Sequence, residues 1–250
     1  MDTLFGTDGI RGRAFEAPLD EATVRRLGAA LAADLGGGTP RVLLAGDTRA
    51  STAALAAWLG SSLRAAGCEV MWGGVLPTPA VSRLLAELGG FAAGVVVSAS
   101  HNPAEDNGIK VLGPTGEKLA DERERHLERL LPSAPVLDGP CLPAVDSGLA
   151  RRYLELLIAG HRPGRPLAGL HVVVDAAHGA ASGLAEELLD RLGARVSAIA
   201  SAPDGRNINR DCGATAPARL AASVLELGAD GGLALDGDAD RALIVDERGR

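Results

Sequence analysis

The chain alternates short continuous runs of apolar residues with longer stretches in which apolar residues recur every three or four positions. The short runs predict strands that are buried on both faces, and the longer stretches predict amphipathic helices. In the first half this pattern predicts strands over 41–47, 68–72, 92–97 and 109–112, and helices over 51–66, 78–88 and 120–131. In the second half it predicts strands over 171–175, 195–200, 232–235 and 243–245, and helices over 148–159, 181–192 and 217–227.

This alternation predicts an α/β fold of two tandem three-layer αβα domains with mainly parallel mixed sheets. Residues 132–147 contain four prolines and few bulky apolar residues, which is typical of a connection between domains. We therefore predict a first domain over residues 1–148 and a second domain over residues 149–250.

The two halves repeat one plan. In each, a helix begins next to a proline (Pro79 and Pro217), ends at Glu-Leu-Gly, and leads into a short strand and a polar loop. The pair Thr78-Pro79 predicts that the Thr78 side chain caps its helix. A duplication would put the two polar loops at equivalent strand ends, where open α/β sheets bind their ligands.

The second polar loop, residues 236–241, carries three carboxylates at alternate positions, Asp236, Asp238 and Asp240. Such carboxylates can converge on one hard divalent cation. A solvated acidic turn is the ordinary alternative, but three acids crowded after a buried strand repel one another without a cation. An EF-hand would need glycine where Arg241 stands, and a haloacid dehalogenase-type phosphatase would need further motifs downstream.

The first polar loop, residues 98–103, reads Ser-Ala-Ser-His-Asn-Pro after a predicted strand. A lone serine here would most often form a turn or a helix cap. The neighbouring His101 and the nearby Lys110 favour a nucleophilic Ser100, because cations stabilise charge on a transferred phosphoryl group. A Ser-His-Asp hydrolase is the competing reading, but the chain has no G-x-S-x-G elbow, and adjacent Ser100 and His101 side chains would diverge.

The composition of the chain excludes several classes of function. The net charge of −7 argues against nucleic-acid binding and against a basic membrane anchor, and no apolar run reaches the length of a membrane span. Of 25 basic residues only Lys110 and Lys118 are lysines, which marks a stretch where an ammonium is required. The three cysteines are widely spaced without a CxxC motif, so we expect neither a disulfide framework nor a zinc site, and a reducing cytoplasm.

Two other polar segments have weaker signals. Residues 47–49 (Asp-Thr-Arg) follow a predicted strand, and without a phosphate-binding motif we interpret them as structural. Residues 207–215, with Asn-Ile-Asn and Cys-Gly-Ala-Thr, form a turn-rich loop to which the sequence assigns no function.

Taken together, four motifs resemble the α-D-phosphohexomutase family, in the family's order along the whole chain. They are FGTDGIRG at 5–12, SASHNP at 98–103, DNGIK at 106–110 and DGDADR at 236–241. Within the family the motifs are most similar to members that interconvert glucosamine 6-phosphate and glucosamine 1-phosphate, on the route to UDP-N-acetylglucosamine and the cell wall. Members that act on glucose or mannose phosphates are the alternative.

The resemblance implies a role for each matching residue. Ser100 would be the phosphoserine, and Asp236, Asp238 and Asp240 would hold Mg²⁺ together with an oxygen on Ser100. Further catalytic roles would fall to Lys110 as general acid or base, to Arg11 and Arg241 as partners of the phosphate charge, and to His101 as a support of the loop.

The resemblance covers the amino-terminal half of the family, because members have four domains and are nearly twice as long. The sugar-recognition motif of the third domain and the phosphate-binding loop of the fourth have no match here. We therefore expect the 250-residue chain alone to be inactive as a mutase, and a non-catalytic module that binds metal or a partner is the remaining alternative. Expected partners are a phosphosugar, with no nucleic acid and no membrane, and self-association through a surface that missing domains would cover.

Overall fold

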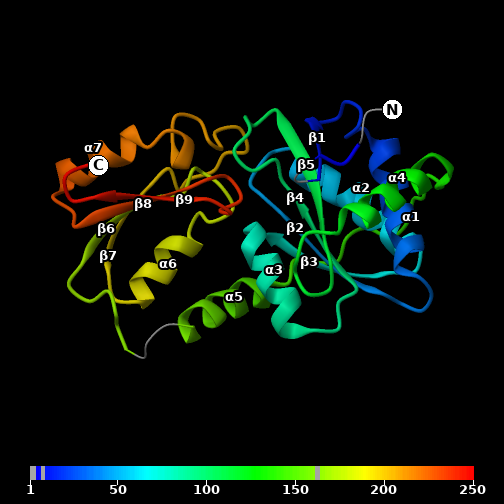
Figure 1. The fold of residues 1–250 in the computed structure, drawn as a ribbon, viewed down its shortest axis with the longest axis horizontal. Helices are drawn as coiled ribbons and strands as arrows, with labels where there is room; N and C mark the ends of the chain where they lie inside the picture. The colour runs from blue at the N-terminus through cyan, green and yellow to red at the C-terminus, as the bar shows by residue number, and fades with distance from the viewer. Residues whose placement is uncertain (1–3, 7–8, 161–163) are drawn as a thin grey trace.

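The computed structural model of the chain describes residues 4–6, 9–160 and 164–250. Two separate β-sheets, each covered by helices on both faces, form two αβα domains side by side (Figure 1). The predicted fold class is thus confirmed. None of the helices within the described ranges is long and apolar enough to cross a membrane.

The first sheet has five strands in the order β1-β5-β4-β2-β3. Strands β2, β3 and β4 are parallel, whereas β5 runs antiparallel to β4 and to β1. Alternate residues of β2 point to opposite faces, because successive side chains of a strand do so: Val42 and Leu44 pack on one side, Leu43 and Ala45 on the other. The strands are β1 (Ile10–Arg13), β2 (Arg41–Gly46), β3 (Glu69–Val75), β4 (Ala93–Val97) and β5 (Asp106–Leu112).

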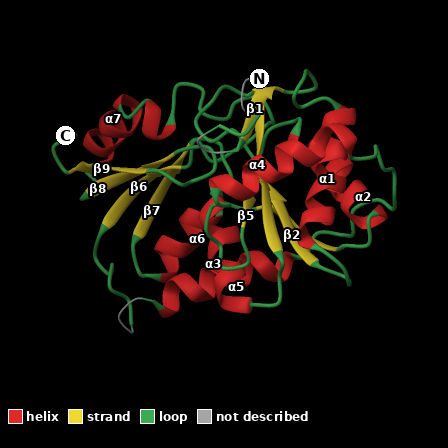
Figure 2. Ribbon diagram, turned by 45° about the vertical axis from the view of Figure 1, so that its right-hand side comes forward, coloured by secondary structure: helices red, strands yellow, loops and turns green. Residues whose placement is uncertain are grey.

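Helices on both faces of the first sheet complete the three layers. Apolar residues of α1, α2 and α4 form one core with the sheet, and those of α3 and α5 form the other. Helix α5 also packs against α6 of the second domain, so these helices lie together between the two sheets (Figure 2). The bounds are α1 (Glu21–Leu35), α2 (Thr52–Ala65), α3 (Thr78–Leu88), α4 (Asp121–Leu130), the 3₁₀ helix η1 (Leu131–Ser133) and α5 (Ser147–Ala159).

The second sheet has the order β7-β6-β8-β9, with β9 antiparallel to β8 and the other pairs parallel. Helix α7 covers one face and α6 the other. The elements are β6 (His171–Asp175), α6 (Leu184–Arg191), β7 (Arg195–Ile199), the 3₁₀ helix η2 (Gly213–Thr215), α7 (Ala218–Leu227), β8 (Gly231–Leu235) and β9 (Ala242–Asp246).

The strand orders agree with the predicted duplication. Strands β3-β2-β4-β5 of the first sheet and β7-β6-β8-β9 of the second have the same order and the same relative directions. The two polar loops therefore follow equivalent strands, β4 and β8.

Two elements were missing from the expectations based on sequence. Helix α1 has a clear signal, because the Asp20 side chain caps it by accepting from the Thr23 amide, and Val24, Leu27 and Leu31 repeat at helical spacing. Strand β1 has only a weak signal, since its four residues include a glycine. The strand predicted from 109 begins at Asp106, because β1 pairs with its first residues and compensates for their low strand propensity.

Candidate active site

The loops that follow β4 and β8 meet at the boundary between the two domains. The Ser100 hydroxyl donates to Asp236 Oδ2 at 2.6 Å, and both residues are fully buried. The two polar loops that the sequence singled out thus form one site, although their residues lie more than a hundred positions apart.

Ser100 has a backbone conformation that its surroundings must hold in place. Its φ is +52°, in the left-handed region where a residue with a side chain is strained by about 1 kcal/mol. Its amide donates to Ser98 Oγ at 3.0 Å, and the Asn102 amide closes the turn onto the Ala99 carbonyl at 3.1 Å. The hydroxyl is aimed at Asp236 by this turn.

Three carboxylates converge beside Ser100. One oxygen from each of Asp236, Asp238 and Asp240 lies within 4.8 Å of the others, with Asp236 and Asp238 buried and Asp240 exposed. Burial and then the two neighbouring carboxylates raise the pKa of Asp236 from 3.8 to about 6, although the Ser100 hydrogen bond opposes the rise. Without a divalent cation, the charged form of Asp236 is therefore disfavoured.

Lys110 on β5 supplies positive charge to the cluster. Its Nζ lies 2.7 Å from Asp238 Oδ2 and 3.1 Å from Asp240 Oδ2. Burial opposes the charged form of Lys110, but the two carboxylates outweigh it and raise the pKa of the ammonium. Burial likewise acts to raise the pKa of Asp238, and the Lys110 ammonium outweighs it and holds that pKa below its usual value. The other lysine, Lys118, lies away from this site and pairs with carboxylates of α4.

Thr78 has a role that the sequence did not predict. Its side chain makes no cap on α3; instead, its hydroxyl donates to Asp238 Oδ2 at 2.6 Å and its amide donates to the Asp238 carbonyl at 3.0 Å. The N-cap prediction for Thr78 was therefore wrong, because a buried acceptor from the second domain takes the hydroxyl. The other Asp238 oxygen, Oδ1, is buried without a hydrogen-bond partner among the described residues.

Two arginines and a histidine lie near the Ser100 loop and the acidic cluster. Arg11 on β1 donates to Asn102 Oδ1 at 3.3 Å, and the Arg241 amide donates to Asp236 Oδ1 at 3.1 Å. His101 Nδ1 lies 3.5 Å from the Ser100 hydroxyl. Burial and then the charges of Arg241 and Arg11 lower the pKa of His101, so its neutral form is favoured. Of the glycine-rich motif that contains Arg11, residues 7–8 lie outside the described residues.

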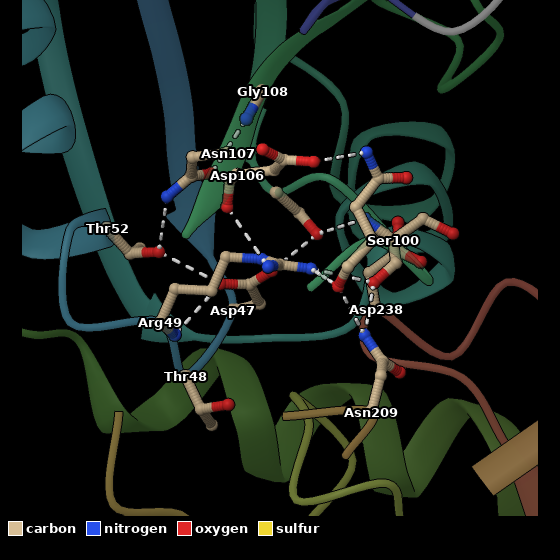
Figure 3. Close-up of polar contacts among 12 residues, drawn as sticks. Asp47, Thr48, Arg49, Thr52, Ser100, Asp106, Asn107, Gly108, Asn209 and Asp238 are labelled. Atoms are coloured by element: carbon tan, nitrogen blue, oxygen red, sulfur yellow. Dashed lines mark hydrogen bonds and ion pairs between the residues drawn. The ribbon is translucent and has the colours of Figure 1, made fainter. Parts of the chain in front are cut away.

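Sequence reasoning missed two residues that contact the Ser100 loop directly. Arg49, in the segment interpreted as structural, and Asn209, in the loop without an assigned function, both donate hydrogen bonds to its backbone (Figure 3). Their acceptors are carbonyl groups, which every residue has, so no motif could have marked the contact.

Comparisons with known proteins agree with this arrangement. The profile described as "Phosphoglucomutase/phosphomannomutase, alpha/beta/alpha domain I" matches residues 2–135, and the profile of domain II of the same family matches residues 152–249. A curated phosphoglucosamine mutase from Thermus thermophilus is 47% identical over 252 residues, which cover 100% of this chain and 57% of that protein. One from Cupriavidus pinatubonensis is 46% identical and covers 98% and 57% respectively.

Solved structures show the same fold. A phosphoglucomutase/phosphomannomutase family protein from Burkholderia thailandensis has a TM-score of 0.83 at 29% identity, over 99% of this chain and 55% of that one. The chain thus spans about half the length of the curated relatives it matches. Since the two profiles cover most of its residues, the chain belongs to the phosphoglucomutase/phosphomannomutase family and corresponds to its first two αβα domains.

Proposed function

We propose that the complete protein is a phosphoglucosamine mutase, which interconverts glucosamine 6-phosphate and glucosamine 1-phosphate through phosphorylated Ser100 and a sugar bisphosphate. The observation that carries the proposal is the buried Ser100 hydroxyl, 2.6 Å from a carboxylate of the acidic cluster. Support for the substrate comes from relatives of that name at 46–47% identity. In this proposal the 250 residues supply the phosphoserine and the metal ligands.

The acidic cluster fits Mg²⁺. Asp236, Asp238 and Asp240 offer oxygen ligands within 4.8 Å of one another, and Asp238 Oδ1 is buried without a partner among the described residues. The raised pKa of Asp236, caused first by burial, is a second sign that a cation is needed there. Bound between these carboxylates and an oxygen on Ser100, Mg²⁺ would neutralise charge on the phosphoryl oxygens.

Lys110 is our candidate for moving protons. During transfer, a sugar oxygen bonds to phosphorus while the bond from phosphorus to Ser100 Oγ breaks. Lys110 gives a proton from Nζ to Ser100 Oγ and takes up the proton of the attacking hydroxyl, so it ends the transfer protonated as it began. Its raised pKa, which burial opposes and the carboxylates of Asp238 and Asp240 cause, keeps Nζ protonated beforehand.

The bordering side chains would hold the anionic substrate. The Arg11 guanidinium donates to Asn102 of the Ser100 loop, and the charges of Arg11 and Arg241 both act on His101; guanidinium groups match phosphate oxygens in pairs. His101, neutral at pH 7 because burial and then these arginines lower its pKa, would hydrogen-bond the loop or the phosphate without adding charge.

The remaining assignments are also proposals. We put the protein in the cytoplasm, because its cysteines are free. With a net charge of −7 we propose no nucleic-acid partner. We keep the proposed division between the domains at 148/149, which assigns most of α5 to the second domain although its apolar residues pack on the first sheet. We also propose that exposed apolar residues of β9 support self-association.

The test uses the 250-residue chain with Mg²⁺ and glucose 1,6-bisphosphate as phosphoryl donor. Intact-mass and peptide mass spectrometry should find one phosphoryl group on Ser100, and none in Ser100→Ala. Assays with glucosamine 6-phosphate should find no turnover by this chain alone, because enclosing the sugar needs protein residues on the opposite side of the substrate. Turnover should return when the carboxyl-terminal half of a relative is added. Phosphate on another residue would contradict the proposal.

A second substrate has support from one observation. The Burkholderia structure at 29% identity bears the name of a phosphoglucomutase/phosphomannomutase family protein. In the reconstituted assay, faster turnover of glucose or mannose phosphates than of glucosamine phosphates would favour this alternative. Phosphorylation of Ser100 without turnover in any mixture would favour a non-catalytic module.

A further inference from the structure

Arg49 uses every one of its side-chain N–H groups beneath the Ser100 loop. Its Nε donates to Asp47 Oδ2 at 2.9 Å, and Nη2 donates to the carbonyls of Ser100 at 3.0 Å and Asn102 at 2.8 Å. Nη1 donates to the carbonyl of Asp106 at 3.0 Å and to that of Pro103. A guanidinium has five N–H donors in a fixed plane, so this set leaves none unused.

The positive charge of Arg49 stabilises the convergence of these acceptors. Four carbonyl oxygens of one short segment point at the same place, and their dipoles repel one another unless positive charge lies between them. The Arg49 side chain is 0% exposed, as is the Asp47 side chain that pairs with it. Burial excludes direct contact with a substrate, so Arg49 can act on the reaction only through the loop that it holds.

Asp47 anchors the guanidinium to the first sheet. Its Oδ1 accepts from the Arg49 amide at 3.0 Å and from Thr52 Oγ1 at 2.9 Å, while Oδ2 also accepts from Ser98 Oγ at 2.6 Å. Ser98 Oγ in turn accepts from the Ser100 amide. A continuous chain of buried hydrogen bonds thus links the end of β2 to the nucleophile.

Asn209 holds the same loop from the second domain. Its Nδ2 donates to the carbonyl of Ser100 at 2.9 Å and to that of Asn102 at 3.0 Å, the two carbonyls that Arg49 Nη2 also binds (Figure 3). The Asn209 amide donates to the Ala177 carbonyl at 2.9 Å, which ties the residue to the end of β6.

We propose that Arg49 and Asn209 are positioning residues that grip the Ser100 loop from its two sides and fix the hydroxyl for phosphoryl transfer. The loop includes a left-handed Ser100, a conformation that relaxes unless the surroundings hold it. Release of the carbonyls moves the Ser100 hydroxyl away from Asp236 and slows the loading of the phosphoryl group. The expected effect on phosphoryl transfer rests on the proposed function. The inference that Arg49 and Asn209 hold the loop does not.

The experiment compares the 250-residue chain with Arg49→Ala, Arg49→Lys and Asn209→Ala. Arg25→Ala is the matched control, because Arg25 also pairs with carboxylates and donates to a backbone carbonyl, that of Leu137, far from the site. Hydrogen–deuterium exchange of residues 98–107 reports the hold on the loop, and the rate of phosphorylation by glucose 1,6-bisphosphate reports its consequence. Guanidinium ion at low millimolar concentration is added to Arg49→Ala, with urea as the neutral control.

We expect exchange in the loop to rise about tenfold or more in Arg49→Ala and less in Asn209→Ala, with the rest of β4 and β5 unchanged. Phosphorylation should slow by a similar factor, and guanidinium but not urea should restore it in part. Arg49→Lys keeps the charge beside Asp47 with fewer donors, so it should fold and fall between the wild type and Arg49→Ala. Arg25→Ala should lower stability without a change in either loop measurement.

Unchanged exchange in Arg49→Ala or, if that variant does not fold, in Arg49→Lys would overturn the inference. Equal phosphorylation rates in the wild type and a folded Arg49 variant would overturn it as well. Failure of the wild-type chain to accept a phosphoryl group would count against the proposed function alone, and the exchange measurement would still decide whether Arg49 holds the loop.

Discussion

Removing the charge of Asp236 should stabilise the protein when no divalent cation is present. Burial and the neighbouring carboxylates raise the pKa of Asp236 to about 6 from an ordinary 3.8, a difference equivalent to about 3 kcal/mol. In Asp236→Asn, the amide can accept from the Arg241 amide and donate to the Ser100 hydroxyl, so the two hydrogen bonds at this position are retained. Allowing for relaxation around the cluster, we expect a gain of about 1–2 kcal/mol at pH 7.5.

The pH dependence follows from the sign of the shift. Because the folded pKa lies above the unfolded value, the folded protein binds the proton more tightly, and Asp236 imposes no cost below about pH 4. The cost develops as the pH rises towards 6 and is complete above it. The advantage of Asp236→Asn should therefore be greatest above pH 6 and disappear near pH 4.

Urea unfolding followed by circular dichroism measures these differences, with EDTA or with Mg²⁺. Magnesium should stabilise the wild type and have little effect on Asp236→Asn, which reverses the order of the two proteins. Asp121→Asn is the control, since that carboxylate is exposed and its pair with Lys118 contributes little. A loss of stability in Asp236→Asn at pH 7.5 in EDTA would refute the reasoning that the charged form of Asp236 is disfavoured without a divalent cation.

Three further changes test separate parts of the structure. Thr78→Val removes the hydrogen bond that orients the Asp238 carboxylate and keeps the shape of the side chain. Isothermal titration calorimetry with Mn²⁺ as the divalent cation should therefore find severalfold weaker binding, and equal affinity would contradict the role of Thr78 in orienting Asp238. Gly179→Ala puts a Cβ 2.3 Å from the Gly237 carbonyl oxygen and should cost about 2 kcal/mol or more in urea unfolding, whereas Gly37→Ala, with open space around it, should not. Ile244→Lys, at a position 78% exposed on the edge strand β9, should reduce self-association in light scattering, and unchanged association would exclude this surface.

The strands could be predicted well because their signal is local. Continuous apolar runs such as Val95-Val96-Val97 are buried on both faces of a mainly parallel mixed sheet, and polar loops at their ends are easily recognised. The acidic and serine loops could be paired because the duplicated plan puts them after equivalent strands. Helix α1 could have been predicted from its cap and spacing, whereas β1 depends on pairing with β5.

The parts of the site that sequence could not predict depend on contacts between distant backbone groups. Arg49 binds carbonyls of residues about fifty positions away, and Asn209 binds two of the same carbonyls from the other domain. Thr78 stands before a proline at a helix start, and its local pattern predicted a cap, but the nearby Asp238 carboxylate is a stronger acceptor for its hydroxyl.

The contacts between the domains explain how a site made of two halves keeps its geometry. The Thr48 hydroxyl donates to the His178 carbonyl at 2.6 Å, and the Ala50 amide donates to the Gly205 carbonyl at 2.9 Å. Both contacts flank Arg49 in the chain, so the segment that holds the Ser100 loop is itself fixed to the second domain. Because that domain also carries Asp236, these hydrogen bonds oppose a rotation between the domains that would change the distance from Ser100 to the carboxylate. The segment around Arg49 therefore helps the two loops themselves to hold the distance between the Ser100 hydroxyl and Asp236.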